Sequence, residues 1–313
     1  MNDVDILALG EPMVEFNQTP EGGGRLYLQG FGGDTSNFAI AAARQGGRVG
    51  YISAVGDDAH GRMLRELWAE EGVDASAVQT DGQGFTAVYF VSHDAAGHHF
   101  GFLRKGSAAS RMTPATLPRE RIAAAKVLHL SGISLAISES ALETCRAAIA
   151  IARAAGVTVS FDTNLRTALW PLATAQTHIG AAIAACDICL PSYDDMTALT
   201  GLDSPDAIVD HCLALGAKTV VLKQGAAGAL VASAAERHRI APMPCIAVDA
   251  TGAGDAFGGA FVARVIAGDG LLAAGRYAAA AAALSTQDYG AVAPIPRAAE
   301  VNALLAKSTE SLE

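Results

Sequence analysis

The chain has 313 residues, of which 51% are hydrophobic and 17% are charged, and its formal net charge is −10. This length predicts one large α/β domain, or one domain with a small appendage, and the composition favours the buried core of a parallel sheet covered on both faces. The negative charge argues against nucleic-acid and anionic-membrane partners, and the lack of a long apolar run or a basic N-terminal region predicts a cytosolic protein.

The first third of the chain predicts two strands of a main sheet and two helices. Apolar runs at residues 5–9 and 50–55 have the character of buried strands. Apolar residues recur at helical spacing in residues 36–44 and 61–71, which predicts a helix after each strand.

A second, smaller sheet is predicted from three short segments at residues 25–28, 86–91 and 99–103. In these segments apolar and polar residues alternate, or β-branched residues are frequent, and glycines bound the first two segments. Both features are typical of strands joined by turns. We expect the small sheet to be a lid on a single domain rather than a domain of its own. The predicted domain spans residues 1–313, with lid strands within 11–32 and 84–105.

The remainder of the chain alternates strands with Ala-rich helices, which predicts parallel pairing with right-handed crossovers. The predicted strands are 127–130, 157–161, 188–190 and 219–222, and the clearest helices are 141–155 and 178–185. In such sheets, ligands bind beyond the carboxyl ends of the strands. We therefore expect residues 162–164, Ser192, Lys223 and the turn before Asp255 to share one rim.

The run DATGAGDAFGG at residues 249–259 is the most informative motif in the chain. Its glycines close a strand-to-helix turn, and a helix N-terminus attracts anions because its first N–H groups have no internal partner. Gly252 and Gly254 remove side chains that would keep a phosphate from those N–H groups. A carboxylate at this point repels phosphate, so Asp255 makes sense as the base that takes a proton from an attacking hydroxyl. The motif predicts a phosphoryl-transfer centre.

A simpler interpretation of the same motif is an ordinary helix cap, since an acid is favoured at a helix start whatever its role. Gly258 and Gly259 weaken that interpretation, because each costs about 1 kcal/mol relative to Ala inside a helix. Their presence indicates close packing or a ligand against the backbone. Two familiar nucleotide motifs are excluded: Phe257 stands where G-x-G-x-x-G needs glycine, and the chain has no Gly-Lys pair for a P-loop.

Cysteine and histidine do not indicate a metal site. Cys186 and Cys189 have C-x-x-C spacing, but no second Cys or His pair has matching spacing, so we expect buried thiols at the start of an apolar strand. The eight histidines form no pair with ligand spacing. Any divalent ion is expected to arrive with a nucleotide.

Two strings together identify a family resemblance. GFGGDTSN at residues 30–37 and DATGAGD at residues 249–255 resemble the two signatures of the ribokinase-like (PfkB) carbohydrate kinases, in the right order and spacing. The resemblance covers essentially the whole chain. It implies an α/β, three-layer ribokinase-like fold with a mostly parallel central sheet and a small β-sheet lid, an ATP-dependent sugar kinase activity, and Mg²⁺ as cofactor.

In that family the second signature supplies the catalytic base and an anion hole. By resemblance, Asp255 is the base, and the N–H groups of Gly252, Ala253 and Gly254 stabilise charge on the moving phosphoryl group. A well-placed base contributes about 10²–10⁴ in rate, and preorganised donors are among the largest contributions to such reactions.

Local strings are most similar to the branch of the family that phosphorylates the sugar acid 2-keto-3-deoxygluconate. They are GFGGDTSN at 30–37, LSGISLAI at 130–137, FDTNLR at 161–166 with LW at 169–170, and FLRKGSAA at 102–109. Arg104 can grip the carboxylate of a sugar acid with two charge-assisted hydrogen bonds, which a neutral sugar cannot accept. Phe102 departs from the tyrosine expected in this branch. Tyr89 is a further predicted substrate contact or, equally, a packing aromatic.

The resemblance implies further binding residues. Gly33, Asp34 and Asn37 would hold sugar hydroxyls, with Asp288 as a late acidic contact. The nucleotide and the sugar acid would meet near Asn164 and Arg166. The predicted ATP contacts are Asn164, Arg166, Ser192, Lys223, Gly225, Gly228, Gly252 and Gly254.

The metal-organising motif Asn-x-x-Glu appears here as Ser192 to Asp195, which predicts an indirect Mg²⁺ contact through Asp195. A monovalent cation near Asp249 is also implied by the resemblance alone.

Other interpretations stay open at this point. A kinase for a neutral sugar such as fructose or ribose fits the same fold, and so do a nucleoside kinase and a non-catalytic sugar or nucleotide sensor. The sequence does not distinguish the gluconate-derived acid from its galactonate epimer. The open edges of the lid predict a homo-oligomer that pairs through them.

Overall fold

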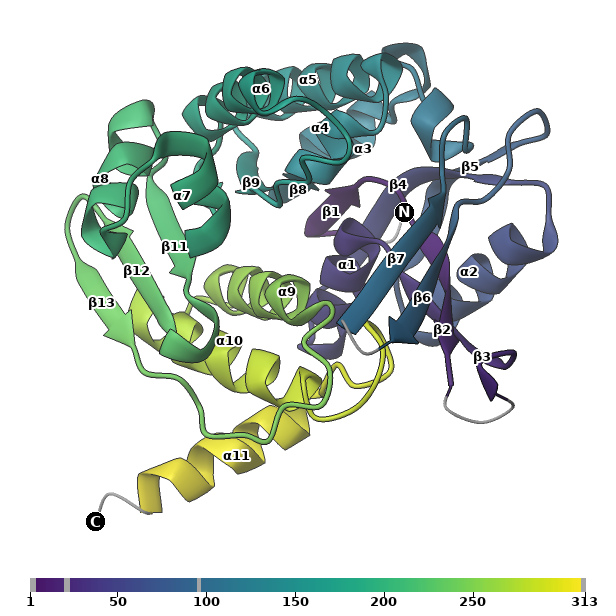
Figure 1. The fold of residues 1–313 in the computed structure, drawn as a ribbon. Coiled ribbons are helices and arrows are strands. Elements are labelled where there is room, and N and C mark those ends of the chain that lie inside the picture. Colours follow the sequence, from purple (N-terminus) through teal and green to yellow (C-terminus); the bar gives the residue numbers. More distant parts are fainter. Residues whose placement is uncertain (1–3, 20–22, 95–96, 311–313) are drawn as a thin grey trace.

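The computed structural model describes residues 4–19, 23–94 and 97–310. Its main feature is a nine-stranded sheet in the order β13-β12-β11-β10-β9-β8-β1-β4-β5 (Figure 1). The strands of this sheet are β1 (Ile6–Leu9), β4 (Val49–Gly56), β5 (Asp74–Asp81), β8 (Val127–Ser131), β9 (Thr158–Asp162), β10 (Ile188–Cys189), β11 (Thr219–Lys223), β12 (Ala229–Ser233) and β13 (Arg237–Ile240).

The centre of this sheet is parallel, as predicted. Strand β1 lies between β4 and β8, with Ile6 opposite Val49 on one side and Val127 on the other. All four residues of β1 are buried, because helices cover both faces of the sheet. Such a strand does not alternate apolar with polar residues. The short β10 carries Cys189, and the thiols of Cys186 and Cys189 are buried and free, as predicted.

The two ends of the sheet differ from the prediction. Strands β12 and β13 form antiparallel pairs at one edge, and β5 forms a parallel edge at the other. No strand was predicted for any of the three. Strand β5 has the sequence DASAVQTD, in which only Val78 is buried, so it lacks the apolar run of a central strand.

Helices form layers on both faces of the sheet, which confirms the three-layer α/β architecture. Successive residues of β1 point to opposite faces: Ile6 and Ala8 join one core, and Leu7 and Leu9 join the other. Figure 1 shows α3, α4, α5 and α6 on one side, and α1, α9 and α10 on the other. The helices are α1 (Asp34–Arg44), α2 (Ala59–Glu70), α3 (Arg119–Ala124), α4 (Gly132–Ala136), α5 (Glu139–Ala154), α6 (Leu172–Ala185), α7 (Tyr193–Thr200), α8 (Pro205–Leu215), α9 (Ala253–Ile266), α10 (Leu271–Ser285) and α11 (Ala298–Glu310), with short 3₁₀ turns η2 (Ala109–Arg111), η3 (Pro114–Thr116) and η4 (Gly225–Ala227).

The predicted helices are present, with shifted ends. Helix α6 is the largest difference, since it begins at Leu172 rather than at residue 178. Among the described residues, no helix combines the length and the apolar character needed to cross a bilayer.

Helices α1 and α9 pack closely, and two glycines make this possible. A Cβ added at Gly259 would lie 2.5 Å from the carbonyl oxygen of Phe38 and 2.8 Å from Cβ of Ala41. A Cβ at Gly258 would lie 3.2 Å from Leu190. Of the two explanations offered by the sequence, close packing is therefore the one that the structure supports, and it brings the N-termini of both helices to the same rim.

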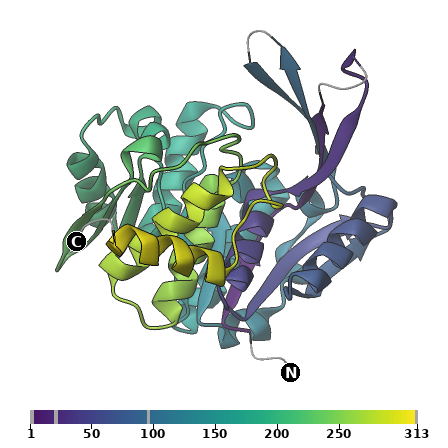
Figure 2. The same cartoon turned by 90° about the horizontal axis from the view of Figure 1, so that it is seen from below.

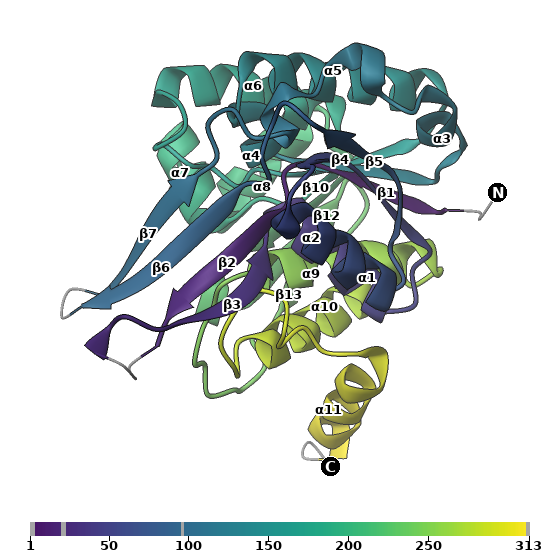
Figure 3. The ribbon, with the colours of Figure 1, turned by 90° about the vertical axis from the view of Figure 1, so that its right-hand side faces the viewer.

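A second sheet of four strands extends away from the main sheet, as Figures 2 and 3 show. Its order is β3-β2-β6-β7, from β2 (Met13–Gln18), β3 (Tyr27–Gly32), β6 (Val88–Asp94) and β7 (Gly97–Leu103). The small sheet predicted from the sequence is thus present, but β2 had no predicted strand of its own and β3 begins two residues later than expected. Residues 20–22 and 95–96 of the predicted lid lie outside the described residues.

Candidate active site

The carboxyl ends of the central strands and the N-termini of α1 and α9 meet at one rim. Asp162 is the last residue of β9, and Lys223 is the last residue of β11. Ser192 follows β10 and forms a parallel bridge with Lys223. The expected rim is therefore present, and it unites residues that are far apart in the sequence.

The start of α9 has the geometry of an anion site. Gly252 has φ 75°, a left-handed conformation that glycine adopts without steric cost, and it leads directly into the helix. The first N–H groups of the helix have no partner one turn earlier. The amide of Ala253 donates to the carbonyl of Ala250 across a turn at 3.2 Å.

Asp255 lies in the first turn of α9 and is held by α1. Nδ2 of Asn37 donates to Oδ2 of Asp255 at 2.8 Å. Among the described residues, Oδ1 of Asn37 is buried and has no hydrogen-bond partner, which is a feature expected of an atom that faces a ligand.

The environment of Asp255 favours its protonated form. Burial raises its pKa to about 8, with the charges of Asp34 and Asp162 acting in the same direction, while Asn37 and Lys223 oppose them. Burial and like charges are the usual means by which a carboxyl group is brought near neutral pKa in an active site.

Asp34 and Asn164 connect α1 with the end of β9. Gly33 precedes α1 with φ 98°, and Asp34 begins the helix. Nδ2 of Asn164 donates to Oδ2 of Asp34 at 2.9 Å, and the amide of Asn164 donates to Oδ1 of Asp162 at 3.1 Å. Asn164 has φ 26°, unusual for a residue other than glycine, and such strain is concentrated at functional sites.

Lys223 forms a buried ion pair with Asp162. Their side chains are only 13% and 8% exposed. Burial acts to lower the pKa of Lys223, but the charge and the hydrogen bond of Asp162 outweigh it, so the pKa is raised and the ammonium keeps its charge. Nζ of Lys223 would lie 3.3 Å from a Cβ on Gly254, so the absence of a side chain there gives the ammonium access to the start of α9.

Asp195 organises the loop after β9. Its Oδ2 accepts hydrogen bonds from Oγ1 of Thr163 at 3.0 Å and from the amide of Leu165 at 3.1 Å. Ser192 caps the same helix, α7, because its Oγ accepts from the amide of Asp195. Across residues 4–19, 23–94 and 97–310, no three His, Cys, Asp or Glu side chains are grouped so that they could hold a metal ion by themselves.

Arg104 follows β7 and is anchored by two residues that the sequence did not single out. Nε of Arg104 donates to Oε2 of Glu11 at 2.8 Å, and Oγ of Ser107 donates to Oε1 of Glu11 at 2.5 Å. The side chains of Arg104 and Glu11 are 11% and 1% exposed. The guanidinium also lies over the ring of Phe102, 5.6 Å from its centroid.

Tyr89 lies on β6 beside Phe102, with stacked rings 5.8 Å apart. Its hydroxyl donates to Glu15, a buried acid on β2. The ring also lies against Gly32, where an added Cβ would be 2.7 Å from Cε1 of Tyr89. The packing role predicted for Tyr89 is therefore supported, and its contact with substrate stays a prediction.

Four predicted residues lie outside the buried cluster. Arg166 is exposed and donates to the carbonyl of Leu165, and Asp288 is exposed and accepts from the amide of Tyr289. Gly225 and Gly228 lie in the turn between β11 and β12. Their predicted roles toward nucleotide and sugar stay predictions.

Asp249 ties the turn before α9 to a later loop. Its Oδ1 accepts from the amide and hydroxyl of Thr251, and its Oδ2 accepts from the amide of Gly290 at 3.0 Å. This contact fixes the approach to Gly252.

Asp162 and Glu11 are the clearest residues that sequence reasoning missed. The sequence predicts that Asp162 lies on the rim, but it does not indicate a role for it. Its partner Lys223 is distant in the sequence, and only the folded structure brings the two together. Glu11 carried no signal, since its partner Arg104 is far away in the sequence.

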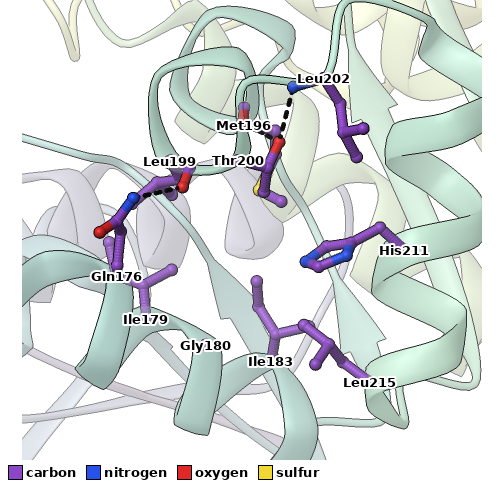
Figure 4. A pocket seen from close by; sticks show the side chains of 10 residues that line it. All are labelled: Gln176, Ile179, Gly180, Ile183, Met196, Leu199, Thr200, Leu202, His211 and Leu215. Atoms are coloured by element: carbon purple, nitrogen blue, oxygen red, sulfur yellow. Dashed lines mark hydrogen bonds between the residues drawn. The ribbon is translucent and has the colours of Figure 1, made fainter. Parts of the chain in front are cut away.

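A cavity also lies away from the rim. It has a volume of about 280 Å³ and lies between α6, α7 and α8, lined mainly by apolar side chains such as Ile179, Met196 and Leu202 (Figure 4). None of the rim acids lines it, so it is separate from the candidate active site.

Comparison with known proteins gives a consistent result. The model of the pfkB family carbohydrate kinases matches residues 4–298. The chain is 36% identical to the 2-dehydro-3-deoxygluconokinase of Thermoproteus tenax, over 95% of this chain and 93% of that protein. It is 32% identical to the probable fructokinase-4 of Arabidopsis thaliana, over 96% of each. A putative ribokinase II of E. coli, solved with ATP and Mg²⁺, superposes with a TM-score of 0.89 at 26% identity, over 97% of this chain and 99% of that one.

Proposed function

The chain belongs to the pfkB family of carbohydrate kinases, and on that premise we propose that it phosphorylates 2-keto-3-deoxygluconate at its 6-hydroxyl. It is a sugar kinase, a phosphotransferase with an alcohol group as acceptor, and it uses ATP with a divalent cation. The choice of a sugar acid is the step that goes beyond the family.

Arg104 is the observation that carries the choice of a sugar acid. Of its guanidinium, Glu11 uses only the edge formed by Nε and Nη2 among the described residues. A carboxylate on the substrate can therefore approach the remaining donors, in a site where burial strengthens charge-assisted hydrogen bonds. A neutral sugar would leave those donors without an anionic partner.

Asp255 is the proposed general base. The primary hydroxyl oxygen of the sugar forms a bond to the γ-phosphorus while the bond to the bridging oxygen of ADP breaks, and the hydroxyl proton passes to the Asp255 carboxylate. The N–H groups of Gly252 and Gly254 would stabilise charge on the transferred group, and that of Ala253 would do so on leaving the carbonyl of Ala250. Asn37 orients the base through its 2.8 Å hydrogen bond.

The sugar site is proposed between α1 and the second sheet. Oδ1 of Asn37 is buried without a partner, so it can accept a sugar hydroxyl. Gly33 and Asp34 would bind further hydroxyls, and the second sheet, with Tyr89 and Phe102, would close over the sugar and exclude water. Arg166 and Asp288 are the proposed outer contacts.

The nucleotide site is proposed along the rim from Ser192 to α9. Because Gly254 has no side chain, the Lys223 ammonium lies beside the start of α9, where it would contact a phosphate. The turn with Gly225 and Gly228 would face the rest of ATP. When bound, Mg²⁺ would offset phosphate charge, as it usually does with one or two carboxylates and several waters. Oδ1 of Asp195 is available for such an indirect contact, since Oδ2 holds the loop after β9. Asn164 would approach the phosphates from the same loop.

A coupled assay of ADP release tests the proposed substrate. The panel contains 2-keto-3-deoxygluconate, its galactonate epimer, fructose, ribose and adenosine, each with MgATP. We expect the two keto-deoxy acids to have the highest kcat/KM. A preference for fructose would contradict the sugar-acid proposal while leaving the base and its helix in place.

Fructose is the second candidate, because fructokinases are similar to this chain over almost its whole length. The same assay separates the two. A protein that binds sugar and ATP without releasing ADP would instead be a sensor.

We also propose that the protein pairs through its second sheet. Leu28 on β3 and Leu103 on β7 are 61% and 59% exposed, and these two strands are the open edges of that sheet. Apolar side chains on open edges favour association with another sheet.

A further inference from the structure

Asp255 lies among several charged groups: Asp34 and Asp162 raise its pKa, and the cation Lys223 lowers it. Proposed catalysis needs the Asp255 carboxylate, but the acids around it favour the protonated form. The groups that face Asp255 are Asp34 and Asn37 from α1, Asp162 from β9, Lys223 from β11 and Tyr89 from β6.

The Asp162–Lys223 pair is built into this arrangement by geometry. Asp162 receives Nζ of Lys223 on Oδ2 and the amide of Asn164 on Oδ1, so its position is fixed from two sides. Lys223 reaches the backbone beside Asp255, because Gly254 has no side chain to obstruct it. Lys223 therefore connects Asp162 to the start of α9, where Asp255 lies.

We propose that Asp162 and Lys223 are positioning residues that set the protonation state of Asp255, Lys223 favouring the carboxylate and Asp162 opposing it. The inference deepens the proposed function, since it concerns the same base. It assigns Lys223 a role that is present before any nucleotide binds.

The inference makes predictions of opposite sign for the two partners. Removing the cation should raise the pKa of Asp255, and removing the anion should lower it, each by about one unit, as is usual for a nearby charge in a partly buried site. Removing both should leave the pKa close to that of the wild type. A pair that only stabilised the fold would not produce shifts of opposite sign.

The test is a ¹³C NMR titration of the Asp255 carboxyl in the ligand-free protein. The variants are Lys223→Gln, Asp162→Asn and the double substitution, with Asp255→Asn to assign the signal. The matched control is Glu71→Gln, which breaks another buried ion pair, Arg44–Glu71, at the far end of α1. We expect the pKa of Asp255 to rise in Lys223→Gln and to fall in Asp162→Asn. In the double variant and in the control it should be close to that of the wild type.

Equal shifts in the same direction, or no shift in either single variant, would overturn the inference. The double variant guards against misfolding, because it leaves no unpaired charge in the site. Because the titration uses no sugar and no ATP, its result is independent of whether the proposed substrate is correct. In the kinase assay, the acid limb of kcat/KM should move with the titration, whereas a role in ATP binding alone would change KM for ATP without moving that limb.

Discussion

At the scale of single residues, Asp255 combines a proposed chemical role with a cost to stability. It is partly buried, it is bonded to Asn37, and three other charged side chains act on it. These same features make its removal informative in two independent measurements.

The first measurement is turnover. Asp255→Asn should keep the shape of the site and the hydrogen-bonding partner Asn37 but lose the base, so kcat should fall by at least about 10²-fold. ATP binding, followed by calorimetry, should persist. Near wild-type turnover would remove Asp255 from the role of base.

The second measurement is the pH dependence of stability. The pKa of Asp255 is about 8 in the folded protein against an ordinary 3.8, so the native state holds a proton that the unfolded chain releases between about pH 4 and about pH 8. The stability associated with this group is present at low pH and is lost as the pH rises through that window. Asp255→Asn should therefore melt at a higher temperature than the wild type at pH 9, by at least about 2 °C, with a smaller difference at pH 5. A constant difference across pH would contradict the raised pKa.

Arg104 provides a test of substrate choice. Arg104→Ala should lower kcat/KM for 2-keto-3-deoxygluconate by about 10–10²-fold, since a hydrogen bond to a charged group is lost, while any activity on fructose changes much less. The control is Arg111→Ala, which removes a half-exposed arginine paired with Asp81 on the surface. Equal losses on both sugars would show that Arg104 supports the fold through Glu11 rather than the substrate carboxylate.

At the scale of elements, the packing of α1 against α9 decides where the site forms. Asn37 on α1 and Asp255 on α9 lie within hydrogen-bond distance of each other. The two helices can approach this closely because α9 has glycine at position 259. The position of the base is thus a consequence of helix packing.

Two glycines on different helices test this dependence. Gly259→Ala would place Cβ 2.5 Å from the Phe38 carbonyl oxygen, so we expect it to lower the free energy of unfolding by about 1–3 kcal/mol. Gly180 lies in α6 with no atom within 4 Å of an added Cβ, and Gly180→Ala should raise that free energy by about 0.4–1 kcal/mol. Urea unfolding of both variants measures the two effects. A Gly259→Ala variant as stable as the wild type would show that α1 and α9 can separate at little cost.

At the scale of the whole molecule, the second sheet is the part with the largest exposed apolar side chains on open edges. Light scattering after gel filtration should find a dimer or larger assembly at micromolar concentration. Leu28→Lys should shift it toward monomer, and Leu272→Lys, on α10, should not. A monomeric wild type would contradict pairing through the sheet.

The sequence by itself determined the α/β class, the small second sheet, the two glycine-rich turns and the rim on which they meet. These features are local or periodic: apolar runs form buried strands, helical spacing forms helices, and glycine turns begin them. It also selected Asp255. A carboxylate repels the phosphate that a helix N-terminus attracts, so its presence there is best explained by a role as the base. The edge strand β13 escaped prediction because its sequence, RHRI, has little apolar pattern. Strand β12 is apolar and buried, but its run of four buried residues, Ala229 to Ala232, is too short to distinguish a strand from a buried helix segment.

Only the tertiary structure decided which charged groups face one another. The residue type of Arg104 was enough to predict that it binds the carboxylate of a substrate. Its partner within the protein, Glu11, is 93 positions away in the sequence. Lys223 and Asp162 are 61 positions apart, and Asn37 and Asp255 are 218 apart. Such pairs have no sequence signature, because their energies depend on distance and burial, and both quantities arise only when the strands and helices have packed.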